Sequence, residues 1–243
     1  MSASHFDQVA AHYDESLPAH VVEHYLRKRV RYIAARRPPP ARGLDVGCGT
    51  GVLAQRLTRL GYKMSGIDPS EGMLEILRSR GPEVEAVAGS GTELPFAAAS
   101  FDFVVSVAVM HHIAAPDAVA ATLAEMVRVL RPCGRIIIWD HNPRNPYWPR
   151  LMARVPQDSG EERLIPQREL IEGVDRAGGT VLECTQLGLV PDFVPPRALR
   201  LAAAAERATE RTPLLRRLCA HNVVLATKSA AGEARLPRAP DVR

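Results

Sequence analysis

Short apolar runs alternate with amphipathic segments between Gly43 and Asp140, and this alternation is the strongest pattern in the 243-residue chain. The runs are continuous and rich in β-branched residues, which is typical of strands buried on both faces of a sheet. Strands that alternate with helices at this spacing indicate βαβ units and a parallel sheet. The predicted strands are 43–47, 63–68, 84–89, 101–109 and 134–140, and the predicted helices are 51–60, 70–80 and 116–131.

The pattern is looser on both sides of this region. The prolines of "RRPPPARG" end a predicted N-terminal helix, because proline cannot continue one, and residues 142–165 show no clear periodicity. We therefore expect a doubly wound α/β fold with a mostly parallel seven-stranded sheet, N-terminal helices and an insertion after the fifth strand. The outer elements are predicted as helices over 4–14, 18–37, 166–177 and 196–218, and strands over 180–187 and 221–228.

The composition narrows the class of protein. The net charge is +4, but aromatic residues make up 5% of the chain, which leaves little material for stacking nucleic-acid bases. The four cysteines are scattered without a C-x-x-C pair, which favours reduced thiols in a cytoplasmic protein over disulfides or a bound metal. No window approaches the roughly 20 apolar residues of a membrane span, so no membrane partner is expected. Much of the positive charge lies in one stretch, which we expect to be the solvated face of a helix: Arg27, Lys28, Arg29, Arg31, Arg36 and Arg37.

A glycine-rich turn follows the first core strand in "LDVGCGTG", residues 44–51. Its G-x-G-x-G spacing departs from the dinucleotide fingerprint, which needs a small residue where Val52 stands. No lysine or arginine lies in 44–55, which argues against a phosphate-binding loop. Asp45 instead precedes the glycines, and its carboxylate suits a ligand that carries positive charge.

A second acidic residue ends the next strand. Asp68 in "GIDPS" lies at the carboxyl end of 63–68, where a carboxylate can accept hydrogen bonds from both hydroxyls of a ribose. On neighbouring strands of one parallel sheet, Asp45 and Asp68 together favour a cationic adenosyl ligand.

The order of these motifs resembles a known family. "LDVGCGTG", "GIDPSEGML", "ELPF", "FDFVVSVAVMHHI" and "MVRVLRPCGRIII" resemble class I S-adenosylmethionine-dependent methyltransferases, in the branch with ubiquinone- and menaquinone-biosynthesis enzymes and many natural-product methyltransferases. The resemblance covers about residues 5–140. It implies S-adenosylmethionine as the cofactor and S-adenosylhomocysteine as its product.

The resemblance also implies which residues hold the cofactor. Relatives usually have Gly-Asp-Ala where this chain has Gly89, Ser90, Gly91 and Thr92, and their aspartate accepts a hydrogen bond from the adenine amino group. Ser90 is expected to accept this bond here, without a negative charge. On the methionyl portion the implied contacts are Asp45, Gly47 and Gly49, with Cys48, Thr50 and Gly51 in the same loop and Tyr13 over that end. The ribose is implied to contact Asp68, and the adenine side Pro69, Met73, Ser90, Gly91 and Thr92. Beside the sulfonium the implied residues are Val107 and His112.

Candidates for the chemistry follow the carboxyl ends of two strands. In-line methyl transfer needs orientation above all, and a histidine general base would add to it. His111 and His112 follow one strand and His141 follows another, and His141 is placed slightly ahead as the candidate base, because His111 or His112 can instead cap the next turn or pack against the N-terminal helix. Within 142–165, Tyr147, Trp148 and Met152 are expected to form a lid and acceptor pocket, unless this segment merely packs back onto the sheet. Asp158, Glu161 and Glu162 in the same segment would repel nucleic-acid phosphates.

The expected organisation is a single domain over 1–228, with a helical cap (1–40), a cofactor-binding core (41–140), a lid and acceptor region (141–220), and a disordered tail (229–243). The expected function is methyl transfer to the O, N or C atom of a small organic acceptor of secondary metabolism, by a monomer or homodimer. Two alternatives remain open: a protein of this fold that uses the cofactor structurally in a cyclisation or in binding, and a methyltransferase acting on RNA, DNA or protein.

Overall fold

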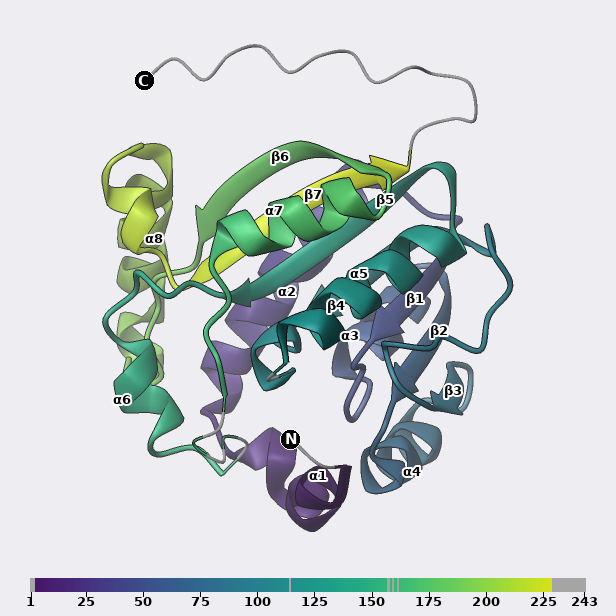
Figure 1. Cartoon of the computed structure of the whole chain (residues 1–243). Helices are drawn as coiled ribbons and strands as arrows, with labels where there is room; N and C mark the ends of the chain where they lie inside the picture. Colours follow the sequence, from purple (N-terminus) through teal and green to yellow (C-terminus); the bar gives the residue numbers. More distant parts are fainter. Residues whose placement is uncertain (1–2, 114, 157, 159, 161, 229–243) are drawn as a thin grey trace, which may run out of the picture.

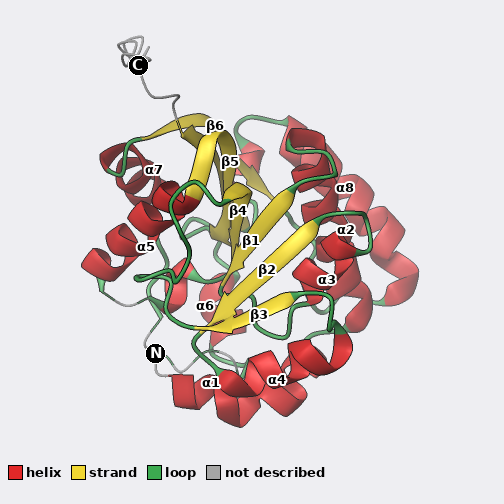
Figure 2. Ribbon diagram, turned by 90° about the vertical axis from the view of Figure 1, so that its right-hand side faces the viewer, coloured by secondary structure: helices red, strands yellow, loops and turns green. Residues whose placement is uncertain are grey.

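The computed structural model describes residues 3–113, 115–156, 158, 160 and 162–228, and these form one seven-stranded sheet between two layers of helices (Figures 1 and 2). The strand order is β3-β2-β1-β4-β5-β7-β6, and all pairings are parallel except those of β7, which runs antiparallel to both neighbours. The predicted fold class is confirmed. The strands are β1 (Arg42–Val46), β2 (Lys63–Asp68), β3 (Glu85–Ala88), β4 (Phe101–Val107), β5 (Leu130–His141), β6 (Gly179–Leu187) and β7 (His221–Lys228).

The helices cover both faces of the sheet. Figure 2 shows α5 and α7 on one side of the sheet and α2 and α3 on the other, while α1 lies beside α4 at the β3 end. The helices are α1 (Ala3–Val9), η1 (Ala10–Glu15), α2 (Ala19–Arg36), α3 (Val52–Thr58), α4 (Glu71–Arg80), η2 (Met110–His112), α5 (Pro116–Val129), α6 (Trp148–Met152), α7 (Gln167–Arg176), η3 (Pro196–Ala198), α8 (Leu199–Arg211) and η4 (Leu215–Leu218).

Successive side chains of the buried strands point to opposite faces of the sheet, and they pack into two separate hydrophobic cores. In β4, Phe103 and Val105 pack with the side chains of α2 and α3, whereas Val104 packs with those of α5 and α7. All three are fully buried. Each such side chain contributes about 1.5–3 kcal/mol on burial, which is why the continuous apolar runs fold as central strands.

Several elements differ from their predicted bounds, and β4, which was expected over 101–109, ends at Val107. The helix expected over 196–218 breaks at Thr212, which takes an extended backbone because Pro213 follows it. β5 begins at Leu130, directly after α5, so this strand is longer than 134–140. A short helix, α6, forms within the irregular 142–165. The tail predicted over 229–243 lies outside the described residues.

The basic stretch of α2 is divided between the surface and the interior. Arg27 and Arg31 are exposed, as expected of a solvated face. Lys28 instead pairs with Glu206 and Glu210 of α8, and Arg29 points inward. The prediction of a uniformly solvated face was therefore wrong for these two residues, because α8 and the site described below cover that side of the helix.

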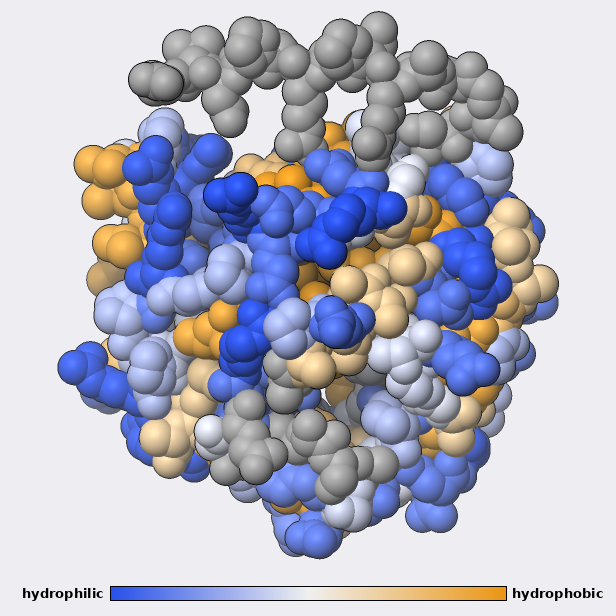
Figure 3. All heavy atoms as spheres, viewed as in Figure 1, coloured by the Kyte–Doolittle hydropathy of each residue, from blue (hydrophilic) through white to orange (hydrophobic). Residues whose placement is uncertain are grey.

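The surface adds two observations. None of the helices in the described part of the chain is long and apolar enough to cross a membrane. Hydrophobic side chains gather at the α8 edge of the molecule, where Leu201, Leu214, Leu215 and Leu218 are exposed (Figure 3).

Candidate active site

A cavity of about 610 Å³ lies at the carboxyl ends of β1, β4 and β5. This is the point at which the strand order reverses about β1, where open α/β sheets bind their ligands. η1 and the start of α2 border it on one side, and α6 and residues 189–193 border it on the other. Its volume is within the range of sites for small molecules and cofactors.

The glycine-rich turn after β1 forms one wall of the cavity. Gly47, Gly49 and Gly51 have φ angles of 73°, 52° and 76°, which L-residues with a side chain rarely adopt. A Cβ atom at Gly47 would lie 2.4 Å from a methyl group of Val109, whereas one at Gly49 would meet no protein atom within 4 Å. Gly49 therefore leaves open space on the cavity side, which is the cradle that a closely approaching ligand requires.

Asp45 and Arg29 place opposite charges on the same cavity. Asp45 is 3% exposed, and burial together with the charge of Asp68 raises the pKa of its carboxyl to about 7, although Arg29 opposes the shift. Burial lowers the pKa of Arg29, and its Nε has no hydrogen-bond partner among the described residues. A buried carboxylate and a buried guanidinium with spare donor capacity fit the ammonium and carboxylate of an amino acid.

The N-terminal helices are tied down over the two cofactor loops. Thr50 Oγ1 donates to Asp14 at 2.8 Å, which joins η1 to the glycine turn. Asp7 accepts from Ser70 Oγ at 2.6 Å and from Gly72 N at 3.0 Å, which joins α1 to the start of α4. This places Tyr13 on the cavity wall, where burial raises the pKa of its hydroxyl to about 12 and keeps it protonated.

Asp68 links the ends of β1 and β2. Its carboxylate accepts from Gly49 N at 2.8 Å and from Ser70 N at 3.0 Å, one bond to each oxygen. Each oxygen keeps a lone pair for a further donor such as a ribose hydroxyl. Asp68 does not itself line the cavity, and neither do Gly51, Pro69 and Met73.

The residues implied for the adenine side lie apart from the cavity. Ser90 and Thr92 are exposed, and their hydroxyls are 2.7 Å apart. Ser90 Oγ also accepts from Thr92 N at 3.2 Å, as in an ordinary serine turn. A Cβ at Gly91 would lie 3.0 Å from Thr122, so this glycine allows close packing on α5. Ser90 as an adenine anchor stays a prediction.

Asp140 organises the opposite wall. Its carboxylate accepts from the backbone N–H groups of Val109 (3.2 Å), Met110 (2.6 Å) and His141 (2.7 Å), and its Oδ1 lies 2.8 Å from His111 Nδ1. Burial alone would raise the pKa of Asp140, but the charge of His111 and these hydrogen bonds hold it below its ordinary value. Because the carboxylate accepts, His111 carries a proton on Nδ1 and presents Nε2 elsewhere.

The other two predicted histidines are neutral at pH 7. Burial and the charge of His111 lower the pKa of His112 to about 3, and burial lowers the pKa of His141 well below its ordinary value. The His141 ring stacks between His111, at 3.8 Å, and Trp148, at 3.5 Å between centroids. Its Nδ1 is buried without a hydrogen-bond partner among the described residues. All three histidines line the cavity.

The predicted acceptor residues are divided by the short helix α6. Tyr147 and Trp148 line the cavity, and so does Leu151, whereas Met152 does not. Leu151 lines the cavity in place of Met152 because Leu151 lies three residues after Trp148, on the same face of the helix. Tyr147 donates to Asp192, and the indole N–H of Trp148 donates to the carbonyl of Ala220. The indole therefore presents an apolar ring to the cavity with its polar atom satisfied.

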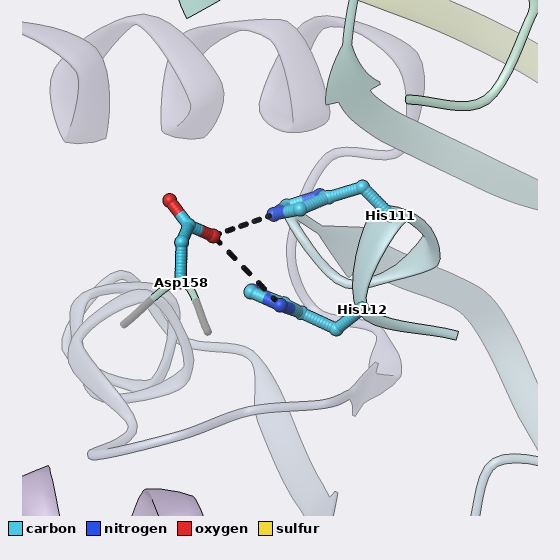
Figure 4. Close-up of side chains that lie close together, drawn as sticks. All are labelled: His111, His112 and Asp158. Atoms are coloured by element: carbon cyan, nitrogen blue, oxygen red, sulfur yellow. Dashed lines mark ion pairs between the residues drawn. The ribbon is translucent and has the colours of Figure 1, made fainter. Parts of the chain in front are cut away.

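Some cavity residues carry signals that the sequence analysis did not use. Arg29 lies three residues after buried Leu26 and four before buried Ile33, so an arginine falls on the apolar face of α2. Asp158 was expected only to add acidity, but its side chain is 5% exposed and lies 4.0 Å from ring nitrogens of both His111 and His112 (Figure 4). Such a group of two imidazoles and a carboxylate can hold a metal ion. Glu161 lies outside the described residues.

Comparisons with known proteins agree with this geometry. A family model described as a methyltransferase domain matches residues 44–138. The chain is 34% identical over 140 residues to a demethylmenaquinone methyltransferase of Renibacterium salmoninarum, covering 54% of this chain and 58% of that one. It is 36% identical over 114 residues to a ubiquinone biosynthesis O-methyltransferase of Agrobacterium fabrum, covering 43% and 46%. The chain thus spans about half the length of the curated relatives it matches.

A solved structure shows the same fold over nearly the whole chain. It is described as a methyltransferase and possible histamine N-methyltransferase of Thermotoga maritima, and its TM-score is 0.68 at 23% identity, covering 93% of this chain and 99% of that one. The family match covers the segment that carries most of the predicted motifs, residues 44–138. Residues 44–138 thus form a methyltransferase domain, and the chain is similar over about half of its length to methyltransferases of quinone biosynthesis.

Proposed function

We propose that the whole chain is an S-adenosylmethionine-dependent methyltransferase that acts on a small organic acceptor, in line with the expectation of a role in secondary metabolism. The observation that carries the proposal is the cavity itself, whose lining includes both the glycine turn after β1 and a group of aromatic and histidine side chains. A donor and an acceptor can therefore lie in contact there, as in-line transfer requires.

The donor end has the donor set that the methionyl portion needs. The buried carboxylate of Asp45 would accept from the ammonium, and the buried guanidinium of Arg29 would donate to the carboxylate. Gly49 leaves room for the ligand beside both, and Tyr13 covers it from η1. Asp68 keeps acceptor capacity for the ribose at the end of β2. When bound, the cofactor supplies an electrophilic methyl group, whose bond to sulfur breaks with its electron pair remaining on sulfur as the acceptor atom bonds to carbon.

The acceptor end favours a compact organic molecule. Trp148, Leu151 and Leu218 contribute apolar side chains to its wall, and Phe193 lies at its edge. His111 and Asp158 provide polar groups on the inner side, and an apolar wall with a few polar groups is typical of sites for small molecules. This supports a small acceptor over RNA or DNA.

His111 is the histidine best placed to act on the acceptor. Asp140 holds its Nδ1, so Nε2 is directed toward the cavity and Asp158. The ring of His141 is sandwiched between His111 and Trp148, which makes it a support for the other two rings. We therefore place His111 before His141 as the residue that contacts the reactive group.

Transfer of label from methyl-labelled cofactor tests this function. The full chain is incubated with a panel of phenols, amines and acids, and the labelled product is identified by mass. We expect label in one class of small acceptor, with S-adenosylhomocysteine formed in equal amount. Asp45→Asn should lower the rate at least tenfold through weaker cofactor binding, while Asp117→Asn, at the exposed start of α5, should not change it.

Two results would contradict the proposal. Conversion of an acceptor without incorporated label, in a reaction that needs bound cofactor, would indicate a non-methylating enzyme of this fold. Label found in RNA or protein, and in none of the small acceptors, would replace the acceptor class.

A further inference from the structure

Three side chains from distant parts of the chain converge at the acceptor end of the cavity. His111 and His112 come from η2, which follows β4, and Asp158 comes from the segment after α6 (Figure 4). His111 Nε2 and His112 Nδ1 each lie 4.0 Å from Asp158 Oδ1, and the three atoms all lie within 4.8 Å of one another. Figure 4 shows both rings directed toward the same carboxylate oxygen.

A second carboxylate extends this group. Glu162 Oε1 lies 3.9 Å from His112 Nδ1, and the Glu162 side chain is 1% exposed. A second carboxylate beside the two imidazoles and Asp158 adds an oxygen donor to the group, and buried charges of this kind are commonly paired or bound to metal ions. Imidazole nitrogen together with carboxylate oxygen is a ligand set that zinc, manganese, cobalt and iron accept, whereas Ca²⁺ and Mg²⁺ prefer oxygen alone.

The surroundings of His111 are those of an oriented ligand. Metal-binding histidines commonly donate their second ring nitrogen to a carboxylate, which fixes the ring and its tautomer. Asp140 accepts from His111 Nδ1 at 2.8 Å in this way, and three backbone N–H groups hold Asp140 in turn. Asp140 and His141 also lie within ligand distance of His111, but the Asp140 carboxylate is already occupied by four donors. The ion is therefore expected on the Nε2 side of His111.

The separations are compatible with an ion after a small adjustment. Ligand atoms bonded at about 2.0–2.2 Å lie roughly 3–4 Å apart around one metal ion. The two distances to Asp158 Oδ1 are 4.0 Å, at the upper end of that range, and the two ring nitrogens lie within 4.8 Å of each other. Rotation of the Asp158 carboxylate by less than about 1 Å toward the rings would bring its oxygen into range.

We propose that His111 Nε2, His112 Nδ1 and Asp158 Oδ1, with Glu162 nearby, bind a divalent transition-metal ion at the acceptor end of the cavity. The second part of this inference rests on the proposed methyltransferase function. The ion binds an acidic hydroxyl of the acceptor, such as that of a phenol or enol, and lowers its pKa. The hydroxyl proton leaves to solvent, and the oxygen then forms the new bond to the methyl carbon. The acceptor class is accordingly one that bonds through oxygen.

Cobalt binding to the full-length protein tests the site directly. Protein treated with a chelator and then freed of it is titrated with Co²⁺, monitored by visible absorption and by calorimetry. We expect one equivalent to bind. His112→Gln and Asp158→Asn should each weaken the affinity at least tenfold, and Asp158→Glu, which keeps a carboxylate, should recover most of it. His12→Gln is the matched control, because His12 pairs with Glu15 at 3.6 Å but both are about four-fifths exposed.

Two further measurements separate this proposal from the proposed function. Binding of S-adenosylhomocysteine and the thermal midpoint are recorded for the two Asp158 variants, and both should stay close to those of the unmodified protein. Absence of binding at about 1 mM Co²⁺, or equal binding by the Asp158→Asn variant, would overturn the metal site. Label transfer at an undiminished rate in chelator-treated protein would leave the methyltransferase intact and refute the role of the ion.

Discussion

The carboxylate of Asp140 lies 2.8 Å from Nδ1 of His111, and the side chains of both are 1% exposed. Asp140 lies at the end of β5 and His111 follows β4, so the contact joins the ends of two neighbouring parallel strands. It decides which nitrogen of His111 faces the cavity.

Replacing Asp140 by asparagine should reduce metal affinity and turnover by about 10–100-fold, the usual effect of losing a carboxylate behind a ligand histidine. Asparagine keeps an acceptor oxygen for the backbone N–H groups but cannot stabilise His111 by charge. Affinity for S-adenosylhomocysteine should change little, because Asp140 lies on the acceptor side. Calorimetry with Co²⁺ and with S-adenosylhomocysteine on one preparation checks this, and equal loss of both affinities would indicate a merely structural role.

Replacing Arg29 by methionine should weaken S-adenosylhomocysteine binding by about 10–100-fold, the effect of one charge-assisted hydrogen bond of about 1.5–3 kcal/mol. Binding of 5′-methylthioadenosine, which lacks the amino-acid portion, should be unchanged. Arg27→Met is the control, since Arg27 lies on the same helix but its side chain is 55% exposed. Parallel loss of both ligands would show that Arg29 does not read the carboxylate.

Cofactor affinity should rise several-fold between about pH 6 and pH 7.5. Burial and the charge of Asp68 raise the pKa of Asp45 to about 7, so its carboxyl is mostly protonated at the acid end of this window and mostly ionised at the other. The ionised form attracts the ligand ammonium, because an ammonium is stabilised by a nearby negative charge. Calorimetric titration with S-adenosylhomocysteine measures the dependence. The Asp45→Asn variant should bind weakly and show a flat profile, and a profile as steep as that of the unmodified protein would assign the dependence to another group.

Gly49→Ala should abolish most cofactor binding at a small cost in stability. A Cβ at Gly49 meets no protein atom within 4 Å, so the cost to folding is that of the left-handed backbone alone, about 1–2 kcal/mol. The added methyl group would occupy the space of the ligand. Gly178→Ala is the matched control, with φ of 85° and no neighbour within 4 Å on an exposed turn. Both variants should lose similar thermal stability, and only the first should lose affinity for S-adenosylhomocysteine.

Glu206→Gln should lower the free energy of unfolding by about 3–5 kcal/mol at pH 7, because it breaks the buried ion pair with Lys28. Among the described residues, Lys28 then keeps one carboxylate partner, Glu210. Burial alone would raise the pKa of Glu206, but a hydrogen bond from His24 and the charge of Lys28 lower it to about 2. The stabilisation is therefore complete above the ordinary pKa of 4.5 and is lost as the pH falls through about 2.

Urea unfolding at pH 7 and at acid pH checks both the size and the sign of this effect. The difference in free energy of unfolding between the Glu206→Gln variant and the unmodified protein should shrink below pH 4.5, the ordinary pKa of a glutamate. Glu172→Gln is the control, since the exposed Glu172–Arg168 pair should contribute less than about 1 kcal/mol. A difference that grows in acid would contradict the assignment.

Much of the fold and part of the site could be read from local patterns. Continuous apolar runs predicted the strands, because a strand buried on both faces has no polar side to show. The glycines and Asp45 were recognisable because a close backbone approach and a cationic ligand each leave a trace within a few residues. Met152 was expected in the acceptor pocket, but Leu151, one residue earlier, lines the cavity. The face that a single-turn helix turns to the cavity depends on what the helix packs against.

The sequence by itself determined the layered α/β architecture, the turn that cradles a ligand and the resemblance to a methyltransferase family. The tertiary structure decided which side chains meet at the acceptor end. Arg29 reaches the cavity because its face of α2 lies against the sheet, where its guanidinium is 6.0 Å from the Trp139 ring. Asp158 reaches His111 because the segment after α6 folds back over η2, where Arg163 N donates to the carbonyl of His111. Such contacts join residues far apart in the chain, and their separation depends on the packing of the intervening elements, which no local pattern of residues records.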